Sequence, residues 1–245
     1  MNIALIGYGK MGKAIEMAGL AKGYAFPLII DLHNSASCTP EHLKSVDVAI
    51  EFTGPHTAVN NIKTCLSAGI PIVSGSTGWL DQWQEVADFC NHHKGCLVYS
   101  SNYSIGVNLF FELNEWLAKL MGNHTEYRVA MEEIHHTEKK DAPSGTAITL
   151  AEGILRQRND LKGWVNKASS DALELPIIST RRDPAPGTHI IRYSSAIDDI
   201  EISHTAHNRI GFANGALAAA AFAINKTGIF NMKDEGKSGM FEYRV

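Results

Sequence analysis

The chain has 245 residues, a formal net charge of −4 and four cysteines. Its length accommodates one large domain or two small ones, and its weak negative charge provides no general attraction for nucleic acid. No apolar run approaches the roughly 18 residues of a membrane span and the cysteines form no C-x-x-C pair, so we expect a cytoplasmic protein with reduced thiols that binds neither membranes nor nucleic acid.

The first hundred residues alternate between short apolar runs and helical patterns. Strands are predicted at residues 1–6, 26–31, 47–52, 71–74 and 96–100, and helices at 13–22, 58–68 and 80–92. Strands that alternate with helices are typical of a parallel sheet covered on both faces. The predicted fold class is therefore α/β, with an N-terminal Rossmann-type doubly wound parallel sheet.

The pattern changes after about Tyr103. A long amphipathic helix is predicted at 107–121, a strand at 127–136 and a helix at 144–157, and the chain alternates in a β fashion between 177 and 204. This pattern predicts a second, α+β domain with a mainly antiparallel open sheet. A last helix at 213–225 is rich in small residues and suits close packing on the first domain. The predicted domains are 1–103 with 210–245, and 104–209.

A glycine loop follows the first predicted strand. Residues 7–12 read GYGKMG, which fits G-x-G-x-x-G, and an aspartate lies 24 residues beyond the first glycine. The three glycines permit a tight turn, close approach of a pyrophosphate and close helix packing, and the helix N-terminus attracts phosphate. Asp31 would bind the adenosine ribose hydroxyls, which favours NADH over NADPH; its alternative role is to cap the strand end. The predicted dinucleotide contacts here are Gly7, Gly9, Lys10, Met11, Gly12 and Asp31.

Three more loops follow predicted strands, at residues 52–55, 75–78 and 100–104. Ligands of open α/β sheets bind at the carboxyl ends of the strands, so these small-residue loops suit the nicotinamide ribose and carboxamide. Simple turn chemistry is the alternative for their glycines and proline. The predicted contacts are Gly75, Ser76, Thr77, Ser100, Ser101, Asn102 and Tyr103.

Residues 133–147, EIHHTEKKDAPSGTA, hold the densest chemistry. Two histidines and two lysines supply proton donors, and Ser144 is a good N-cap for a helix whose first N–H groups suit a carboxylate. The segment therefore suits a small acidic substrate. A metal site is the less favoured alternative, because no third ligand follows His135 and His136 at usable spacing, and a solvated loop is the other.

At this segment the sequence closely resembles the dihydrodipicolinate reductase family. Its signature, E-x-H-H-x-x-K-x-D-A-P-S-G-T-A, is met at every fixed position. The resemblance extends to the glycine loop, to the F-T-x-P and G-[ST]-T-G loops and to residues 201–216, whereas residues 161–176 resemble nothing informative.

The resemblance implies an oxidoreductase that uses NADH or NADPH to reduce 4-hydroxy-tetrahydrodipicolinate (dihydrodipicolinate) to tetrahydrodipicolinate, in lysine and diaminopimelate biosynthesis. It implies that the first domain binds the dinucleotide, and that the second binds a cyclic dicarboxylate and forms a homotetramer through its sheet. It makes His135 and Lys139 the catalytic proton donors, whereas Lys140 falls at a variable position. The implied substrate contacts are His136, Ser144, Gly145 and Thr146, with no metal.

The sequence departs from the family near the cofactor. Lys10 stands where an arginine is common, and Leu32 stands where an arginine often follows the acid, which argues against a strong preference for NADPH. The main alternative function is another Rossmann dehydrogenase acting on a small acidic substrate. A non-enzymatic dinucleotide sensor is a further alternative, which would leave the two histidines and Lys139 without a role.

Overall fold

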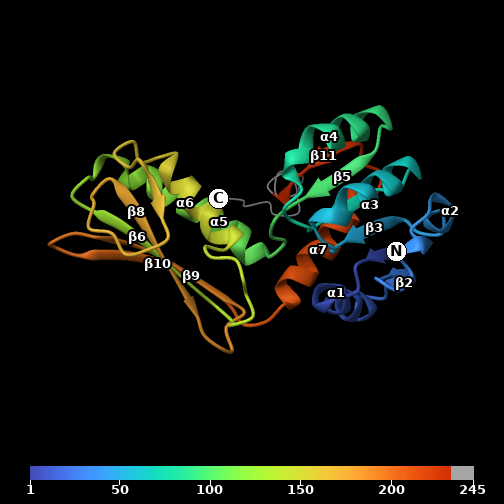
Figure 1. The fold of residues 1–245 in the computed structure, drawn as a ribbon, viewed down its shortest axis with the longest axis horizontal. Coiled ribbons are helices and arrows are strands. Elements are labelled where there is room, and N and C mark those ends of the chain that lie inside the picture. The colour runs from blue at the N-terminus through green and yellow to red at the C-terminus, as the bar shows by residue number, and fades with distance from the viewer. Residues whose placement is uncertain (233–245) are drawn as a thin grey trace. The chain divides into compact units, whose positions relative to one another are not determined.

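The computed structural model describes residues 1–232 and arranges them in two units (Figure 1). One unit comprises Met1–Ile105 and the chain from Ile210 onward, and the other is Gly106–Arg209. Residues 233–245, which the predicted first domain includes, lie outside the described part of the chain.

Six parallel strands form the sheet of the first unit, in the order β11-β5-β4-β3-β1-β2. The strands are β1 (Asn2–Ile6), β2 (Ala25–Ile30), β3 (Val48–Glu51), β4 (Ile72–Ser74), β5 (Cys96–Tyr99) and β11 (Gly228–Phe230). The helices are α1 (Lys10–Leu20), α2 (Pro40–Leu43), α3 (Pro55–Ser67), α4 (Trp83–His92) and α7 (Ile210–Ala223), with short 3-10 turns at Ser35–Ser37 and Leu80–Gln82. The predicted doubly wound parallel sheet is confirmed.

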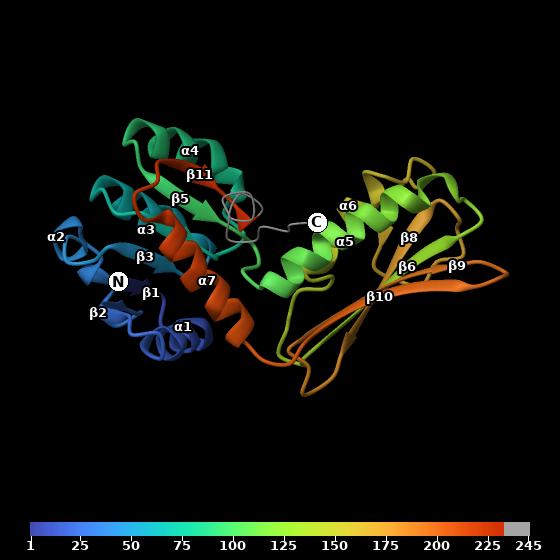
Figure 2. The same ribbon diagram turned by 180° about the vertical axis from the view of Figure 1, so that it is seen from behind.

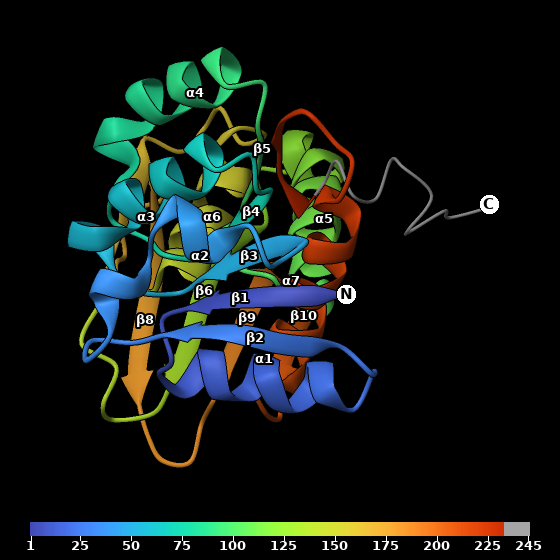
Figure 3. The same ribbon diagram turned by 90° about the vertical axis from the view of Figure 1, so that its right-hand side faces the viewer.

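The inner strands β1, β3, β4 and β5 are buried on both faces, which explains their unbroken apolar runs, whereas the edge strand β2 has exposed residues. Ile3 and Leu5 of β1 pack with α1 and α7, whereas Ala4 and Ile6 pack with α2, α3 and α4. Figure 3 shows β1, β2 and β3 lying side by side, with their ends at a common edge. The chain leaves β1 toward β2 and returns on the other side to β3, so the ends of these strands form the switch point at which α/β proteins bind ligands.

Helix α7 owes its close packing to small side chains. A Cβ added at Gly215 would lie 1.7 Å from the carbonyl oxygen of Tyr103, so only glycine fits against the β5 loop. Ala213, Ala216 and Ala220 are fully buried in the same cluster. The predicted packing of this helix on the first domain is confirmed, whereas the three-residue strand β11 that follows it was missed.

The second unit contains a five-stranded sheet in the order β10-β9-β6-β8-β7. Its elements are α5 (Ile105–Leu120), a 3-10 turn at Met121–Asn123, β6 (Arg128–His135), α6 (Gly145–Leu155), β7 (Gly163–Val165), β8 (Glu174–Arg181), β9 (Gly187–Ser194) and β10 (Asp199–Ala206). Helices α5 and α6 cover one face of this sheet (Figure 2) and share a core with it.

The second sheet is mixed. Strand β9 pairs antiparallel with β10 and β6, as predicted, but β8 pairs parallel with β6 and with β7. Helix α6 carries the chain back after β6, as a βαβ crossover does, and residues 166–173 carry it back after β7, so β6, β7 and β8 run in the same direction. Strand β7 lies within 161–176, the stretch that the sequence left unassigned.

Two helix starts differ from prediction. Helix α1 begins at Lys10 and not at residue 13, because the Lys13 N–H already donates to the Gly9 carbonyl at 3.1 Å. The predicted helix 80–92 is divided into a 3-10 turn and α4. Within residues 1–232 no helix is long and apolar enough to cross a bilayer, and the four cysteines are unpaired thiols.

Candidate active site

The three glycines of the first loop differ in their surroundings. A Cβ at Gly7, whose φ is +99°, would lie 2.2 Å from the Phe52 carbonyl oxygen, and one at Gly12 would lie 2.3 Å from the Gly7 oxygen. A Cβ at Gly9 would meet no described atom within 4 Å. Packing therefore requires Gly7 and Gly12, whereas Gly9 faces open space at the start of a helix without an acidic residue in its first turn. This arrangement fits an anionic pyrophosphate.

A cavity of about 550 Å³ opens beside this loop. It is formed at the ends of β1, β2 and β3, and its lining includes Gly7, Tyr8, Gly9, Asp31, Leu32, His33, Thr53, Gly54, Pro55, Thr57 and Asn61. Lys10, Met11 and Gly12 stand at the start of α1 and do not line it.

Asp31 caps the turn after β2 and also lies in the wall of the cavity. One carboxylate oxygen, Oδ1, accepts hydrogen bonds from the backbone N–H of His33 at 2.7 Å and of Asn34 at 3.3 Å, which caps the turn after β2. The residue also lines the cavity. Leu32 is 92% exposed and brings no positive charge to a 2′-phosphate.

The loops after β4 and β5 are held in place by hydrogen bonds to other residues of the first unit. The Tyr103 hydroxyl donates to the carbonyls of Ser74 at 2.9 Å and Val98 at 3.0 Å, and the Asn102 side chain accepts from the Ser104 N–H at 2.8 Å. Ser76, Asn102 and Tyr103 are buried. Of the residues predicted in these loops (Gly75, Ser76, Thr77, Ser100, Ser101, Asn102 and Tyr103), none lines the cavity described above.

In the second unit, the alternation of β6 places Glu133 and His135 on the buried face of the sheet. The Glu133 carboxylate accepts from the Ser144 N–H at 3.1 Å, and His135 Nδ1 lies 3.3 Å from its Oε2. Burial alone would raise the pKa of Glu133, but the nearby His135 ring and the hydrogen bonds from Ser144 outweigh it and hold that pKa well below its usual range. Glu133 is therefore an anion beside His135.

Arg181 of β8 connects this carboxylate to the lysine loop. Its Nη2 donates to Glu133 Oε1 at 3.1 Å, and its Nε donates to the Lys139 carbonyl at 3.2 Å. Lys139 Nζ forms an ion pair with Asp141 at 2.8 Å. The structure thus brings His135, the Lys139 loop and the start of α6 together around Glu133.

Ser144 caps α6, as predicted. Its Oγ accepts from the Ala147 N–H at 3.2 Å and lies 3.2 Å from His189 Nε2. Because Ser144 is only 2% exposed, its N–H and its hydroxyl hold the start of the helix in place. Gly145, by contrast, is exposed and has open space beside its Cα.

His189 of β9 was not predicted from the sequence. Burial, together with the charges of His135 and other neighbours, lowers the pKa of His189 to about 3. It therefore remains a neutral imidazole between Ser144 and Glu133, whose Oε2 is 3.8 Å from its Nε2.

Glu133, His135 and His189 also offer three possible metal-ligand atoms within 4.8 Å of one another. The fold thus supplies a third ligand that sequence spacing did not. However, the Arg181 guanidinium and the Ser144 N–H already bind both oxygens of Glu133. A divalent ion here would lie next to the permanently charged Arg181, so these three residues are better explained as part of a hydrogen-bonded network than as a metal site.

We expect His189 to make the protein sensitive to mild acid. His189 takes up a proton near pH 6.5 in the unfolded chain but stays neutral down to about pH 3 in the folded chain. The free energy of unfolding is therefore highest above pH 6.5 and decreases as the pH falls below that value. This group alone contributes a slope of about 1.4 kcal/mol per pH unit. In guanidinium unfolding between pH 6.5 and 4.5, His189→Gln should show a shallower decline than the unmodified chain; equal slopes would contradict this.

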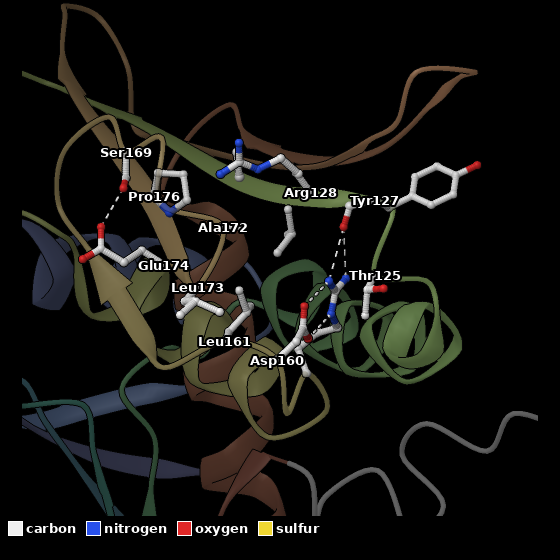
Figure 4. A pocket seen from close by; sticks show the side chains of 13 residues that line it. Thr125, Tyr127, Arg128, Asp160, Leu161, Ser169, Ala172, Leu173, Glu174 and Pro176 are labelled. Atoms are coloured by element: carbon white, nitrogen blue, oxygen red, sulfur yellow. Dashed lines mark hydrogen bonds and ion pairs between the residues drawn. The ribbon is translucent and has the colours of Figure 1, made fainter.

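The second unit holds another cavity, of about 360 Å³, shown in Figure 4. Its polar groups are already paired: Arg158 Nε donates to Asp160 at 2.8 Å, and Ser169 donates to Glu174 at 2.6 Å. None of the predicted catalytic or substrate residues lines it. This cavity is therefore not the candidate substrate site.

The chain matches two family models. Residues 1–103 match "Dihydrodipicolinate reductase, N-terminus", and residues 106–235 match "Dihydrodipicolinate reductase, C-terminus". A 4-hydroxy-tetrahydrodipicolinate reductase from Christiangramia forsetii is 48% identical over 235 residues, which cover 96% of this chain and 97% of that protein. One from Methanoregula boonei is 35% identical over 199 residues, or 78% of this chain and 75% of that protein.

Solved structures show the same fold. A dipicolinate-bound dihydrodipicolinate reductase from a Paenisporosarcina species has a TM-score of 0.70 at 21% identity, covering 94% of this chain and 97% of that chain. A probable dehydrogenase from Thermotoga maritima has a TM-score of 0.57 at 11% identity, covering 97% and 93%.

Proposed function

This chain belongs to the dihydrodipicolinate reductase family, and from that premise we propose how its residues divide the work of the reaction. The enzyme is an oxidoreductase that reduces 4-hydroxy-tetrahydrodipicolinate to tetrahydrodipicolinate with a nicotinamide dinucleotide, in lysine and diaminopimelate biosynthesis. The resemblance inferred from the sequence is confirmed, and the alternatives of another dehydrogenase or a sensor are set aside.

We propose that the first unit holds the dinucleotide. The open space at Gly9 and the uncapped start of α1 support pyrophosphate binding there, and Asp31 would accept a ribose hydroxyl. The loops at 75–77 and 100–103 would hold the nicotinamide half. When bound, the nicotinamide supplies the hydride.

We propose that the second unit holds the substrate dicarboxylate. Gly145, which is exposed, and Thr146, which is partly buried, stand in the first turn of α6 and would bind one carboxylate, with His136 beside the same loop. Ser144, whose groups are already used, would position this helix start instead of touching substrate.

Proton delivery would come from His135 and Lys139. The observation that supports this assignment best is the Glu133 network, which joins His135, the Lys139 loop and the start of α6. His135, whose Nδ1 lies 3.3 Å from the Glu133 carboxylate, would give a proton to the ring as the hydride adds. Cationic Lys139 would stabilise the negative charge that develops on the nitrogen and carboxylate side of the ring.

We further propose that the enzyme is a homotetramer assembled through the second sheet. The face of this sheet opposite α5 and α6 carries Ala130, Ile134, Ile178 and Ile190, and Ile178 is 40% exposed. On this face Glu132 lies between Ile178 and Ile190, so the apolar side chains flank a carboxylate. Exposed apolar side chains on an open sheet favour burial against another copy. Light scattering should give four chains for the wild type, and an Ile178→Lys variant should lower that number.

The reaction is tested with a coupled assay. Pyruvate and aspartate semialdehyde, with a dihydrodipicolinate synthase, generate the substrate in situ, and the loss of absorbance by NADH or NADPH is followed. Oxidation that pyridine-2,6-dicarboxylate abolishes is the expected result. No oxidation by a folded protein that still binds dinucleotide would contradict the proposed division of roles.

We expect NADH to be preferred over NADPH. The Asp31 carboxylate repels a 2′-phosphate, and the exposed Leu32 does not offset this. An Asp31→Ser/Leu32→Arg variant should raise kcat/KM for NADPH relative to NADH by about 10- to 100-fold, which corresponds to about 1.4 kcal/mol per tenfold. Leu32→Arg alone is the control for added charge. An unchanged ratio in the double variant would remove Asp31 from cofactor selection.

A further inference from the structure

Glu51, the last residue of β3, is a fully buried carboxylate that the proposed roles above do not use. Its Oε1 accepts from the Thr53 N–H at 2.8 Å, from the Ser76 hydroxyl at 2.7 Å and from the Thr53 hydroxyl. Its Oε2 accepts from the Ser74 hydroxyl at 2.7 Å. One side chain thus binds four donors from the ends of two neighbouring strands.

Hydrogen bonds connect Glu51, through Thr53, to residues that line the proposed dinucleotide cavity. Thr53 lines that cavity, and its hydroxyl accepts from Thr57 at 2.8 Å and from Asn61 at 3.4 Å, both of which line it too. On the other side, Ser76 belongs to the loop after β4, and its Oγ also accepts from the Thr53 N–H at 2.9 Å. The carboxylate therefore holds the β3 loop and the β4 loop to each other.

The third cofactor loop is joined to the same strand end. Tyr103, in the loop after β5, donates its hydroxyl to the Ser74 carbonyl at 2.9 Å, and its ring packs edge-on against Phe52 with ring centroids 5.8 Å apart. A Cβ at Gly75 would lie 2.2 Å from the Phe52 ring. The spacing of the three loops is thus set by contacts that converge on residues 51–53 and 74–76.

A buried carboxylate is a costly way to hold a fold together. No lysine, arginine or histidine of residues 1–232 forms an ion pair with Glu51, so hydrogen bonds alone compensate its burial. A well-packed apolar residue would stabilise the sheet at lower cost. What an apolar residue cannot do is accept four hydrogen bonds and fix the directions of two loops.

We propose that Glu51 is a positioning residue of the dinucleotide site, which acts through Thr53 and Ser76 and does not touch the cofactor. The proposal rests on the family's use of a nicotinamide dinucleotide and is independent of the roles given to His135 and Lys139. Without the carboxylate, the hydroxyls of Thr53, Ser74 and Ser76 lose their acceptor, and the two loops lose their fixed spacing.

The test is Glu51→Gln, which keeps the volume and one acceptor oxygen but replaces the other with a donor. The dissociation constant of NADH, measured from its fluorescence on binding, should rise about 10- to 100-fold, in line with the loss of hydrogen bonds to a charged group. KM for NADH should rise with it. At saturating NADH, kcat and the KM of the ring substrate should stay within about twofold. Glu51→Asp, which keeps the charge, should recover part of the affinity.

Two further variants keep the proposal testable. Glu85→Gln removes an exposed glutamate that pairs with Lys63 in the same unit, and NADH binding should not change. Ser74→Ala removes one donor to Glu51 from a position that is fully buried and does not line the cavity, and NADH should bind several-fold more weakly. If Glu51→Gln fails to fold, NADH binding by Ser74→Ala tests whether Glu51 positions the dinucleotide site.

An unchanged NADH dissociation constant in folded Glu51→Gln, or in Ser74→Ala, would overturn the proposal and leave Glu51 a purely structural residue, even if the melting temperature fell. Failure of the unmodified chain to oxidise NADH in the coupled assay would instead count against the proposed function. The two failures are therefore distinguishable.

Discussion

Lys139→Ala is expected to lower kcat by about 10²- to 10⁴-fold, the range that a positioned acid contributes. The Lys139 ammonium is 23% exposed and its partner, Asp141, is 58% exposed, so the variant leaves an aspartate that water can solvate. The loop itself should keep its place, because Arg181 binds the Lys139 backbone carbonyl and not its side chain. NADH binding should stay nearly unchanged, since the predicted dinucleotide residues belong to the other unit.

The next residue provides the matched control. Lys140 is exposed, and Lys140→Ala should keep kcat within about twofold. Steady-state rates at saturating NADH, together with NADH binding measured by fluorescence, separate the possible outcomes. A loss of cofactor affinity in Lys139→Ala, or equal losses of turnover in both variants, would contradict the role of Lys139 as a proton donor.

Much of the fold could be predicted because its signals are local. The inner strands of the first unit are buried on both faces and appear as unbroken apolar runs, and the glycine loop predicts a helix after β1, although that helix begins three residues earlier than expected. Strands β7 and β11 have three residues each, too few for a periodic pattern, and both exist because they pair with strands elsewhere in the chain. The parallel direction of β8 likewise follows from the return of the chain through α6 and through residues 166–173, which local sequence does not specify.

Part of the candidate site could likewise be predicted from the sequence, and part of it could not. His135, Lys139 and Ser144 lie within one short motif, so their proximity could be anticipated. Arg181 is 48 residues away from Glu133 in the chain, and His189 comes from yet another strand, so only the folded sheet reveals that they share a carboxylate. One signal was available: residues two apart on a strand share a face, which placed Glu133 beside His135.

Glu51 shows how such a residue escapes sequence analysis. It ends an apolar strand, where a single acid resembles the start of a loop. Its partners Ser74 and Ser76 follow β4, the neighbouring strand, and small hydroxyl residues at a strand end are also ordinary turn chemistry. The contacts that give these residues a joint role become visible only when the pairing of β3 with β4 is known.

Glu133→Gln is expected to lower kcat at neutral pH by about 10- to 100-fold while the protein remains folded. Glutamine keeps the volume and an acceptor oxygen for Arg181, whereas alanine would leave a partly buried guanidinium unpaired. Glu133 Oε2 lies 3.3 Å from His135 Nδ1, so the variant removes the charged partner that holds the imidazole in place. The loss should appear in kcat, whereas the dissociation constant of NADH should stay within about twofold, because the predicted dinucleotide residues belong to the other unit.

The value of kcat per folded enzyme separates this role from simple destabilisation. Glu115→Gln removes a different glutamate–arginine pair of the same unit, at 2.7 Å from Arg156, and should leave kcat unchanged. A merely structural Glu133 would lower the amount of folded enzyme in the variant without lowering kcat per folded enzyme. If kcat per folded enzyme stayed within about twofold of the wild type, the carboxylate would not act on His135. The grouping of His135, Lys139 and α6 around Glu133 would then reflect packing, and the assignment of His135 as the acid would lose its main structural support.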